Sequence, residues 1–429
     1  MAARRSASAS SDNGYTRAVP PLSNNRDQPA RVAWILLDWA ASAFSTILIT
    51  LVVAYVERVV FADAAWGVPG GVVWAWIMAA AMLASALLTP FLSARADRTH
   101  GHKRWLMIST AVGSGACLLL AAVPPTARLA VATAIVLAAV GFDMAQVFTG
   151  SLLPRIAQGS AADRLSAAGF GAGYLGGAIA LILATALVAN RESLGLSGPG
   201  ALRGTFVLMG SWWLLFSLPA AFTPMGDGRS ADHAATSAGE LFGFARSLAG
   251  GGAGGLGRTL LGAVLVLGAV QTAISQFSSL ALEQFHLESA ALVRLVLMVQ
   301  FVALPGAIFI GWLSTRWSRA GSLRVCLAGW LAVVVLAAFV TTPGQLTALA
   351  VLLALVLGGV QSVVRATIAA LAPQGRFGAT FGLLQVGTKL AGFAASLLFG
   401  AAYAATGDSR TGLAVLFVQL AAGWWVLAR

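Results

Sequence analysis

The sequence predicts an all-α membrane protein whose twelve transmembrane helices form two six-helix bundles. Three observations support this fold class. First, 58% of the residues are hydrophobic and only 10% are charged, whereas soluble proteins usually contain about 25% charged residues. Second, the chain is divided into apolar runs of about the length that crosses a hydrocarbon core as a helix. Third, the two halves of the chain resemble each other in sequence.

The apolar runs predict twelve spans in order along the chain. Seven runs contain no Asp, Glu, Lys or Arg: 64–94, 105–127, 165–190, 204–226, 259–282, 295–315 and 411–428. The longer uncharged run 325–364 is interrupted by Pro343-Gly344 and is interpreted as two helices. The segments 32–61, 128–153 and 377–405 are equally apolar apart from isolated charges. Each span has roughly the 20 residues that a transmembrane helix needs.

The basic residues are distributed asymmetrically between the two sets of loops. If the N-terminus is cytoplasmic, only Arg58, Arg128, Arg191, Arg203, Arg294 and Arg410 fall in the loops on the opposite side. This is the positive-inside pattern. The net charge of +12 therefore reports topology and does not indicate a nucleic-acid partner. We expect a multi-pass protein of the bacterial cytoplasmic (inner) membrane, with both termini in the cytoplasm.

The polar segments define the expected domains. Residues 1–30 are rich in Ser, Asn, Arg and Pro and lack the apolar core of a signal peptide, which predicts a disordered cytoplasmic tail. A transit peptide is the alternative, but Asp12 and Asp27 argue against it. Residues 31–222 are expected to form the first bundle and 257–429 the second. The intervening segment 223–256 is predicted to be a Gly-rich cytoplasmic linker.

Three pairs of matching segments predict that the chain arose by duplication. SLLPRI (151–156) corresponds to AALAPQ (369–374), and a glycine-rich span follows each of them. The loop 93–104 likewise corresponds to 311–321. Within the first glycine-rich span, 169–177 contains a G-x-G-x-x-G pattern, but no strand precedes it, so dinucleotide binding is not expected. Gly169, Gly173 and Gly177 instead predict the close approach of two helices.

The loop SARADRTHGHKR (93–104) resembles the G-x-x-x-D-R-x-G-R-[RK] signature of the major facilitator superfamily. Asp97 and Arg98 match its central pair, and Arg104 matches its basic tail. In that family these residues hold the cytoplasmic ends of the two halves together. A carboxylate near a helix N-terminus is favourable in any case, because it interacts with the helix dipole. An ordinary positive-inside loop is the alternative. In the second half Thr315 takes the Asp position, so that copy is expected to be degraded.

Ionisable residues within the predicted spans are the strongest functional signal, since each costs about 2.5–3.5 kcal/mol on insertion scales at a helix centre. Asp143 and Lys389 lie about 15–16 Å from the cytoplasmic ends of their helices, and Arg365 lies at about 10 Å. We hypothesise that Asp143 pairs with Lys389 in one conformation, with Arg365 as a competing partner. The alternative is a fixed structural ion pair. Asp143, interpreted as the only carboxylate near the membrane centre, is also the candidate for proton coupling, which requires it to part from its cation.

Polar residues in four spans are candidates for a central solute cavity, because in this superfamily the corresponding helices surround the pathway. They are Asp38, Trp39 and Ser42 in 32–61, Gln146 in 128–153, Gln271 and Thr272 in 259–282, and Gln361 in 325–364. A lone glutamine could instead hydrogen-bond a neighbouring helix. Because few of these residues are charged, a small zwitterionic or neutral solute is expected.

A more specific resemblance covers nearly the whole chain. DWAASAF (38–44), the run from Leu153 to Ile156, Val270-Gln271-Thr272, Gly359-Val360-Gln361 and Phe381-Gly382 appear in the order typical of the vacuolar amino-acid effluxer branch, which is linked to autophagy and has bacterial members. The resemblance implies a twelve-helix facilitator fold and transport of amino acids. It also implies that Arg365 and Lys389 are typical of the branch. Ala41, Gly268 and Thr380 depart from its pattern, and Asp143 is not part of it.

The sequence therefore predicts an alternating-access secondary transporter that works as a monomer in the lipid bilayer. Two alternatives remain open, a proton-coupled exporter of amphipathic compounds and a non-transporting membrane sensor with the same fold. The two cysteines, Cys117 and Cys326, lie in separate predicted spans and indicate neither a disulfide framework nor a metal site. No cofactor and no enzymatic activity are expected, since no nucleophile–base pair is evident.

Overall fold

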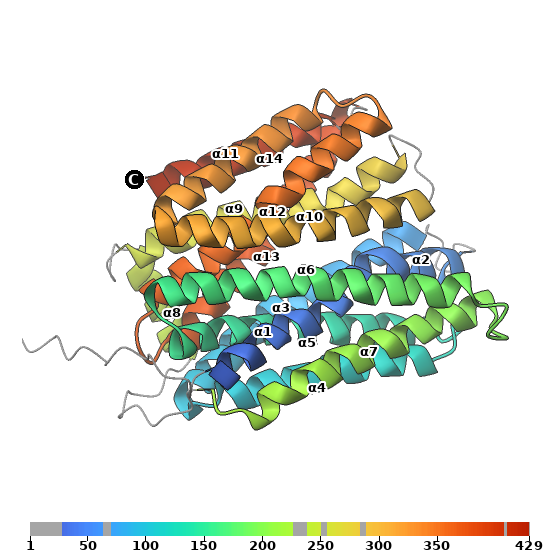
Figure 1. Cartoon of the computed structure of the whole chain (residues 1–429), viewed down its shortest axis with the longest axis horizontal. Helices are drawn as coiled ribbons and strands as arrows, with labels where there is room; N and C mark the ends of the chain where they lie inside the picture. Colours follow the sequence, from blue (N-terminus) through green and yellow to red (C-terminus); the bar gives the residue numbers. More distant parts are fainter. Residues whose placement is uncertain are drawn as a thin grey trace, which may run out of the picture.

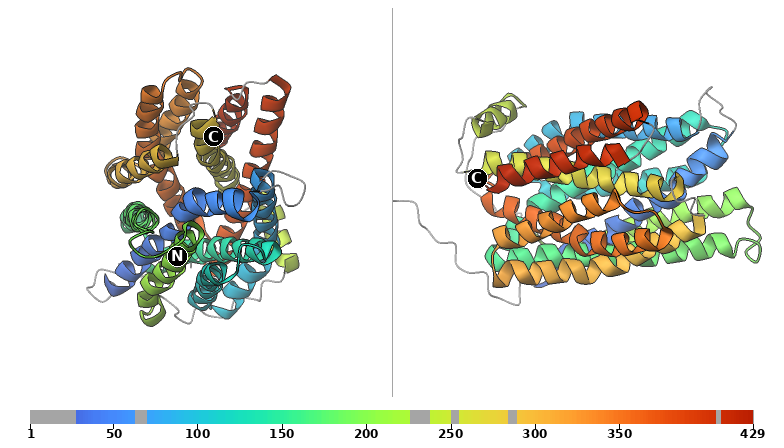
Figure 2. Two further views of the ribbon diagram at one scale, coloured as in Figure 1. Left: turned by 90° about the vertical axis from the view of Figure 1, so that its right-hand side faces the viewer. Right: turned by 90° about the horizontal axis from the view of Figure 1, so that it is seen from above.

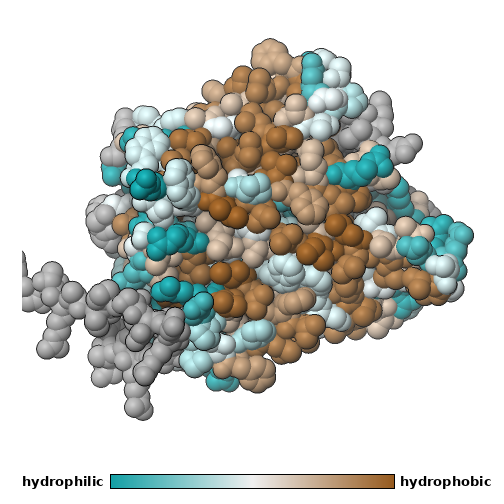
Figure 3. Space-filling model, viewed as in Figure 1, coloured by the Kyte–Doolittle hydropathy of each residue, from teal (hydrophilic) through white to brown (hydrophobic). Residues whose placement is uncertain are grey.

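The computed structural model describes residues 28–62, 70–225, 238–249, 255–283, 289–406 and 410–428. This part of the chain folds into helices and contains no strand. Twelve of the helices are long and apolar enough to cross a membrane, as the sequence predicts. Hydrophobic residues form a broad surface band across the middle of the molecule, and hydrophilic residues gather at both ends of it (Figure 3). Residues 1–27 of the predicted tail 1–30 and parts of the predicted linker 223–256 lie outside the described residues, whereas residues 28–30 belong to the first helix and not to a disordered tail.

The helices of the first half follow one another with short connections. The first span starts as α1 (Gln28–Ile47) and continues through two π-helical turns and α2 (Val53–Tyr55) to Val60. The other spans of this half are α3 (Gly70–Thr99), α4 (His102–Ala122), α5 (Arg128–Ile156), α6 (Gly159–Ala189) and α7 (Gly198–Phe222).

The second half repeats this arrangement after a short extra helix. Helix α8 (Ala238–Ala249) lies outside the membrane-crossing helices (Figure 2). The six spans that follow are α9 (Leu256–Glu283), α10 (Ser289–Arg316), α11 (Arg319–Ala337), α12 (Pro343–Leu371), α13 (Phe377–Thr406) and α14 (Arg410–Ala428).

The predicted division of the run 325–364 at Pro343-Gly344 is confirmed. Pro343 is the first residue of α12, a position at which its missing N–H is not needed. Thr342 caps the helix, because its side chain accepts a hydrogen bond from the Gln345 backbone N–H while the Gln345 side chain accepts one from Thr342. The break between α11 and α12 is therefore encoded locally.

The two halves form two bundles in which equivalent helices pair in the same way (Figure 1). In the first bundle α1 packs against α6 and α7, and α4 packs against α5 and α7. In the second, α9 packs against α13 and α14, and α11 packs against α12 and α14. Between the bundles α3 packs against α13, and the equivalent α10 packs against α6. This repetition is the pseudo-two-fold arrangement predicted from the internal sequence match.

We call the end of the molecule at which α1 begins and α14 ends the terminal end, and the opposite one the far end. Helices α3, α5, α10 and α12 finish at the terminal end, and α4, α6, α11 and α13 start there. The turn between α3 and α4 is only two residues long, and His100 adopts a left-handed conformation with φ of 49°. Asp97 and Arg98 consequently lie in the last turn of α3.

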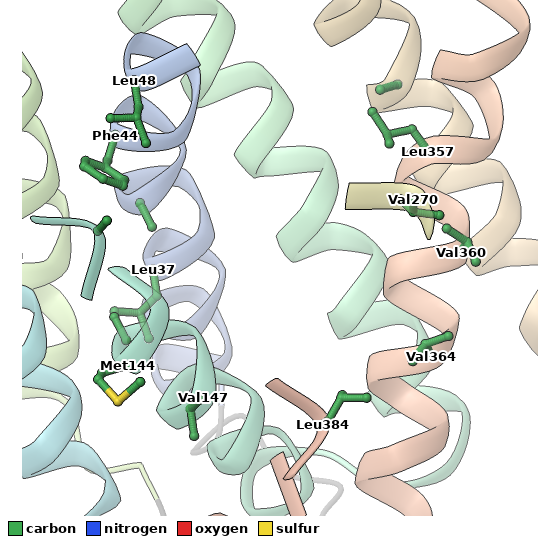
Figure 4. Packing of buried hydrophobic residues seen from close by; sticks show 14 of the residues in the cluster. Leu37, Phe44, Leu48, Met144, Val147, Val270, Leu357, Val360, Val364 and Leu384 are labelled. Carbon is green, nitrogen blue, oxygen red and sulfur yellow. The ribbon is translucent and has the colours of Figure 1, made fainter. Parts of the chain in front are cut away.

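The predicted role of the α6 glycines in close helix packing is confirmed. A Cβ atom at Gly177 would collide with the Thr46 hydroxyl of α1, and one at Gly176 would lie 2.8 Å from the Trp39 carbonyl oxygen of the same helix, whereas one at Gly173 would make an ordinary contact of 3.4 Å with the Asp38 carbonyl oxygen. At Gly176 and Gly177, α1 and α6 therefore leave no room for a larger side chain. Buried apolar side chains form the packed interior of both bundles, among them Phe44 and Met144 in the first and Val364 and Leu384 in the second (Figure 4).

Candidate functional site

Two ion pairs within the membrane-crossing helices join the bundles, and Asp143 forms one of them. Lys389 Nζ of α13 lies 2.9 Å from Asp143 Oδ1 of α5. The same carboxylate accepts hydrogen bonds from Ser85 Oγ at 2.8 Å and from Gln385 Nε2 at 3.1 Å. The Asp143 side chain is 5% exposed and that of Lys389 is 22% exposed. The two residues that the sequence predicted to pair are thus in contact; their role in transport stays a prediction.

Arg365 forms the second pair, with a partner that the sequence analysis did not assign to it. Its Nη2 atom lies 2.8 Å from Asp38 Oδ2 of α1, and both side chains are buried. Arg365 also donates from Nε to Ser166 Oγ at 3.0 Å and from Nη2 to the Ser166 carbonyl at 2.9 Å. The expectation that Asp143 is the only carboxylate near the membrane centre was therefore wrong. Asp38 is a second one, lying about 15 Å along α1 from its first residue.

Two aromatic rings enclose the Arg365 guanidinium. Its central carbon lies 4.5 Å from the Trp34 ring centroid and 4.2 Å from that of Phe170, distances typical of cation–π contacts. Gly169 makes room for the ion pair, because a Cβ there would collide with Asp38 and lie 2.9 Å from Arg365 Nη2. We call Trp34, Asp38, Ser166 and Phe170, together with the space that Gly169 leaves, the Arg365 cage.

At the terminal end Asp97 connects the bundles through a helix N-terminus. Its Oδ1 accepts a hydrogen bond from the Gly378 backbone N–H at 2.8 Å, and its Oδ2 accepts one from Ala379 at 2.7 Å. Both donors belong to the first turn of α13, where backbone N–H groups have no helical partner. The structure thus places Asp97 where the predicted latch needs a carboxylate. Arg98 and Arg104 are exposed, and within the described residues neither side chain forms a hydrogen bond or an ion pair with the second bundle.

His102, which lies in the predicted loop 93–104, is buried beside this latch. Its Nε2 lies 3.1 Å from Asp97 Oδ1, and its Nδ1 lies 2.8 Å from Ser151 Oγ. The Ser151 hydroxyl also lies 2.9 Å from the Phe148 carbonyl, to which it donates. His102 is the first residue of α4, so the two-residue turn after α3 directs its ring back onto Asp97. The ring positions the carboxylate for α13.

The second copy of the motif has lost its carboxylate, as expected, but a different ion pair joins the bundles at the equivalent place. Thr315 only bonds the Trp312 carbonyl of its own helix. Arg319, the first residue of α11, donates to Asp163 Oδ1 of α6 at 2.7 Å and to the Gly159 carbonyl at 2.8 Å. The contact lies between the equivalent elements, the α10–α11 turn and the start of α6, but the charges are exchanged: here the turn supplies the cation. The signature motif has an acid in the turn, so it does not predict a contact in which the turn supplies the cation.

The other predicted cavity residues are used in different ways. Trp39 stacks on Trp212 of α7 with ring centroids 5.6 Å apart. Ser42 donates to the Trp39 carbonyl, and Gln361 donates to the Leu357 carbonyl, so both bond their own helix. Thr272 donates to the Gly392 carbonyl and packs α9 onto α13.

Two glutamines remain as candidate lining residues. Gln146 is half-buried on α5, and Gln271 is exposed on α9. Neither side chain is recorded in a hydrogen bond within the described part of the chain.

The charged contacts between the bundles lie at or near the terminal end. The contacts of Asp97 and Arg319 lie at the terminal end, and the two ion pairs lie within about 20 Å of it, counting along the helices. Towards the far end, the described part of the chain has a polar contact between the bundles at Gln300, whose Nε2 donates a hydrogen bond to Thr46 Oγ1 at 3.1 Å. The structure therefore represents a conformation that is closed at the terminal end.

Comparison with known proteins finds the same fold in solved structures and identifies a family for this chain. Residues 73–428 match the family described as vacuole effluxer Atg22 like. The uncharacterized MFS-type transporter YxiO of Bacillus subtilis (strain 168) is 26% identical over 407 residues, covering 92% of this chain and 93% of that protein.

Solved structures at lower identity share the architecture. The human organic anion transporter MFSD10 (TETRAN) superimposes with a TM-score of 0.73 at 14% identity, covering 94% of this chain and all of the other. FucP in the outward conformation gives 0.72 at 15% identity, covering 94% and 98%. These likenesses concern the fold alone. With the family match over most of its length, the chain belongs to the Atg22-like vacuole effluxer family and is a membrane transporter of the major facilitator type.

Proposed function

We propose that this protein is a secondary transporter that moves a small solute by alternating access, with the two bundles rocking around a central site. The observation that supports this most is that Asp38–Arg365 and Asp143–Lys389 each join one bundle to the other. A buried charge is expensive in a membrane and is usually functional. Ion pairs placed between two moving bodies can form in one conformation and separate in the other.

In the proposed cycle, opening the terminal end breaks the polar contacts that join the bundles there, among them the Asp97–α13 cap, Arg319–Asp163, Asp38–Arg365 and Asp143–Lys389. Removing one partner from a buried pair is costly, because the other charge stays in a poor solvent. The open conformation therefore requires water or solute to replace the lost partners. A solute that binds better to one conformation shifts the equilibrium by its difference in affinity.

Amino acids are the solutes that we propose to test first. The vacuole-effluxer family and the resemblance of DWAASAF and the later motifs favour them. The Lys389 ammonium has three donors and is partly exposed, so it could accept a solute carboxylate. FucP and XylE are described as proton symporters of fucose and xylose. At 12–15% identity they do not indicate the solute of this chain.

Proton coupling through Asp143 is compatible with this geometry only in another conformation. Both of its carboxylate oxygens accept hydrogen bonds, and Lys389 lies beside one of them. A nearby cation and donated hydrogen bonds favour the ionised form. A proton could add after Asp143 separates from Lys389 and Gln385 of the second bundle.

We propose that the terminal end faces the cytoplasm of a bacterial cell, with the protein in its inner membrane and acting as a single chain. The basic residues Arg98, Lys103 and Arg104 lie at the terminal end, as the positive-inside rule requires. Labelling of a cysteine at Arg98 with a membrane-impermeant maleimide in intact cells tests this. Labelling only after the cells are permeabilised supports the orientation, and labelling from outside contradicts it.

The transport test is counterflow in proteoliposomes with each of the amino acids, with and without a pH gradient. The wild type should exchange at least one of them, and Asp143→Asn should lose most of this flux at equal protein incorporation. Arg324→Gln, an exposed change on α11, is the matched control. Wild-type flux in Asp143→Asn would remove Asp143 from the mechanism. Flux that appears only with a pH gradient would favour the proton-coupled alternative, and no flux of any solute would favour the sensor.

A further inference from the structure

We propose that the Arg365 cage is a binding subsite for an organic cation, the ammonium or guanidinium group of a transported solute. In the conformation described here Arg365 itself fills the subsite. The proposal rests on the alternating-access function above, because the subsite becomes available only when the bundles separate at the terminal end.

The cage and its occupant belong to different bundles. Trp34 and Asp38 lie on α1, and Ser166 and Phe170 lie on α6, whereas Arg365 lies on α12 of the second bundle. All recorded polar and ring contacts of the guanidinium are made with this set. Separation of the bundles would therefore withdraw the cation and leave the rest of the cage behind as one unit.

The Trp34 wall of the cage and the spacing of its two helices are fixed by contacts that do not involve Arg365. Trp34 Nε1 donates to the Thr149 carbonyl of α5 at 2.8 Å, which holds the indole within the first bundle. Helices α1 and α6 are held together by the close contacts of Gly176 and Gly177 described above. A site whose walls are set by its own bundle loses little conformational freedom when it takes a new ligand.

The chemistry of the vacated cage selects for a cation. Two ring faces offer negative electrostatic potential, and the Asp38 carboxylate adds a formal charge. Asp38 Oδ2 is buried, and within the described residues no donor forms an aligned hydrogen bond with it. The 2.8 Å contact with Arg365 Nη2 is thus an ion pair that leaves acceptor capacity unused. The Ser166 carbonyl and hydroxyl supply further acceptors. A neutral or anionic group would leave the carboxylate uncompensated.

The Asp143 site lacks these properties, which is why the proposal concerns the cage alone. Both Asp143 oxygens already accept hydrogen bonds, from Ser85 and Gln385. Ser85 belongs to the first bundle and would stay with Asp143 when the bundles part. No ring is recorded in a cation–π contact with Lys389, whereas two enclose Arg365.

The test vacates the cage by mutation and offers it a small cation. The variant Arg365→Ala is purified in lipid nanodiscs and titrated with ethylguanidinium chloride or with N-ethylurea, its neutral analogue, at constant ionic strength and millimolar concentrations. Binding is followed by calorimetry. Ethylguanidinium should bind Arg365→Ala with about one equivalent and at least about tenfold more tightly than the urea. The double variant Asp38→Asn/Arg365→Ala should lose this preference, and the wild type should bind at least about tenfold more weakly because its cage is filled.

Each other result overturns the proposal. Equal binding of the two analogues would show that the cage does not select charge, and unchanged preference after Asp38→Asn would place the site elsewhere. If Arg365→Ala does not yield monodisperse protein, it is purified in the presence of either analogue. A better yield with ethylguanidinium alone supports the cage, and equal yields contradict it.

The link to transport has a separate readout. In wild-type proteoliposomes that show counterflow, ethylguanidinium but not N-ethylurea should reduce the flux, and unchanged flux would overturn the subsite assignment. Absence of any counterflow in the wild type contradicts the proposed function, whereas the equilibrium titration of Arg365→Ala still tests the cage. The two failures are therefore distinguishable.

Discussion

The ion pairs Asp38–Arg365 and Asp143–Lys389 join the bundles in the same way, but they differ in which of the two partners is fully engaged by other contacts. In each, the first bundle supplies the acid and the second supplies the base. In the first pair the base is fully engaged, by Ser166 and two rings, while Asp38 Oδ2 lacks an aligned hydrogen bond. In the second the acid is fully engaged, and Lys389 keeps an exposed portion.

From this difference we predict that the two pairs hold the bundles together with unequal strength. A buried charge that loses its partner stays in a medium that solvates it poorly, whereas a partly exposed ammonium can be hydrated. Breaking the Asp38–Arg365 pair should consequently cost more than breaking Asp143–Lys389. The following variants test this order, beginning with the largest expected effect.

Replacing Arg365 by Met should destabilise the protein by about 3–5 kcal/mol, because Asp38 is left buried without its cation. Thermal unfolding in detergent, followed by the loss of monodisperse protein, measures this. The double variant Asp38→Asn/Arg365→Met should recover most of the loss, since neither charge then remains. A single variant as stable as the wild type would show that Asp38 is solvated without Arg365.

Replacing Lys389 by Met should cost less, about 1.5–3 kcal/mol, because Asp143 keeps its hydrogen bonds from Ser85 and Gln385. The same unfolding measurement gives the value, and Asp143→Asn in the same background is the compensating change. If Lys389→Met proved more damaging than Arg365→Met, the order inferred from exposure would be wrong.

Gly169→Ala tests whether space in the Arg365 cage matters. The added methyl would collide with Asp38, so the pair must shift, at a cost of about 1–3 kcal/mol typical of overpacking. Gly115→Ala on α4 is the matched control, because no atom lies within 4 Å of its Cβ position. Equal stability of the two variants, measured by thermal unfolding, would mean that α1 and α6 can separate without penalty.

The Asp97 and Arg319 contacts at the terminal end also differ in burial, and removing either should cause the smallest losses of stability. Asp97 is buried and caps α13, so Asp97→Ala should cost about 0.5–2 kcal/mol, as for other caps. Arg319 is 26% exposed, so Arg319→Ala should cost about 0.2–1 kcal/mol. Alkylation of a cysteine at Ser93, buried beneath Gly378, in a background without Cys117 and Cys326 reports opening of this end. Faster alkylation in Arg319→Ala than in Asp97→Ala would reverse the comparison.

The sequence predicted some contacts of the site and missed others for identifiable reasons. Asp143 and Lys389 could be matched because both are isolated charges at similar depth in their helices. The partner of Arg365 was missed although Asp38 had been identified as a polar residue in the first span. Depth alone does not give the direction in which a side chain leaves its helix, and Arg365 points towards α1 and α6 rather than α5. Asp163 and Arg319 were missed because their charges are exchanged relative to the motif.

The sequence alone determined the number of helices, their order, the break at Pro343 and the duplication, since each of these follows from hydropathy, helix capping and spacing along one chain. The docking of the bundles determined which charges meet. That outcome depends on helix rotation and on the space left by Gly169 and Gly378, which lets residues far apart in the sequence come within 3 Å of each other. Only the tertiary structure could show that Arg365 fills a cage of the opposite bundle.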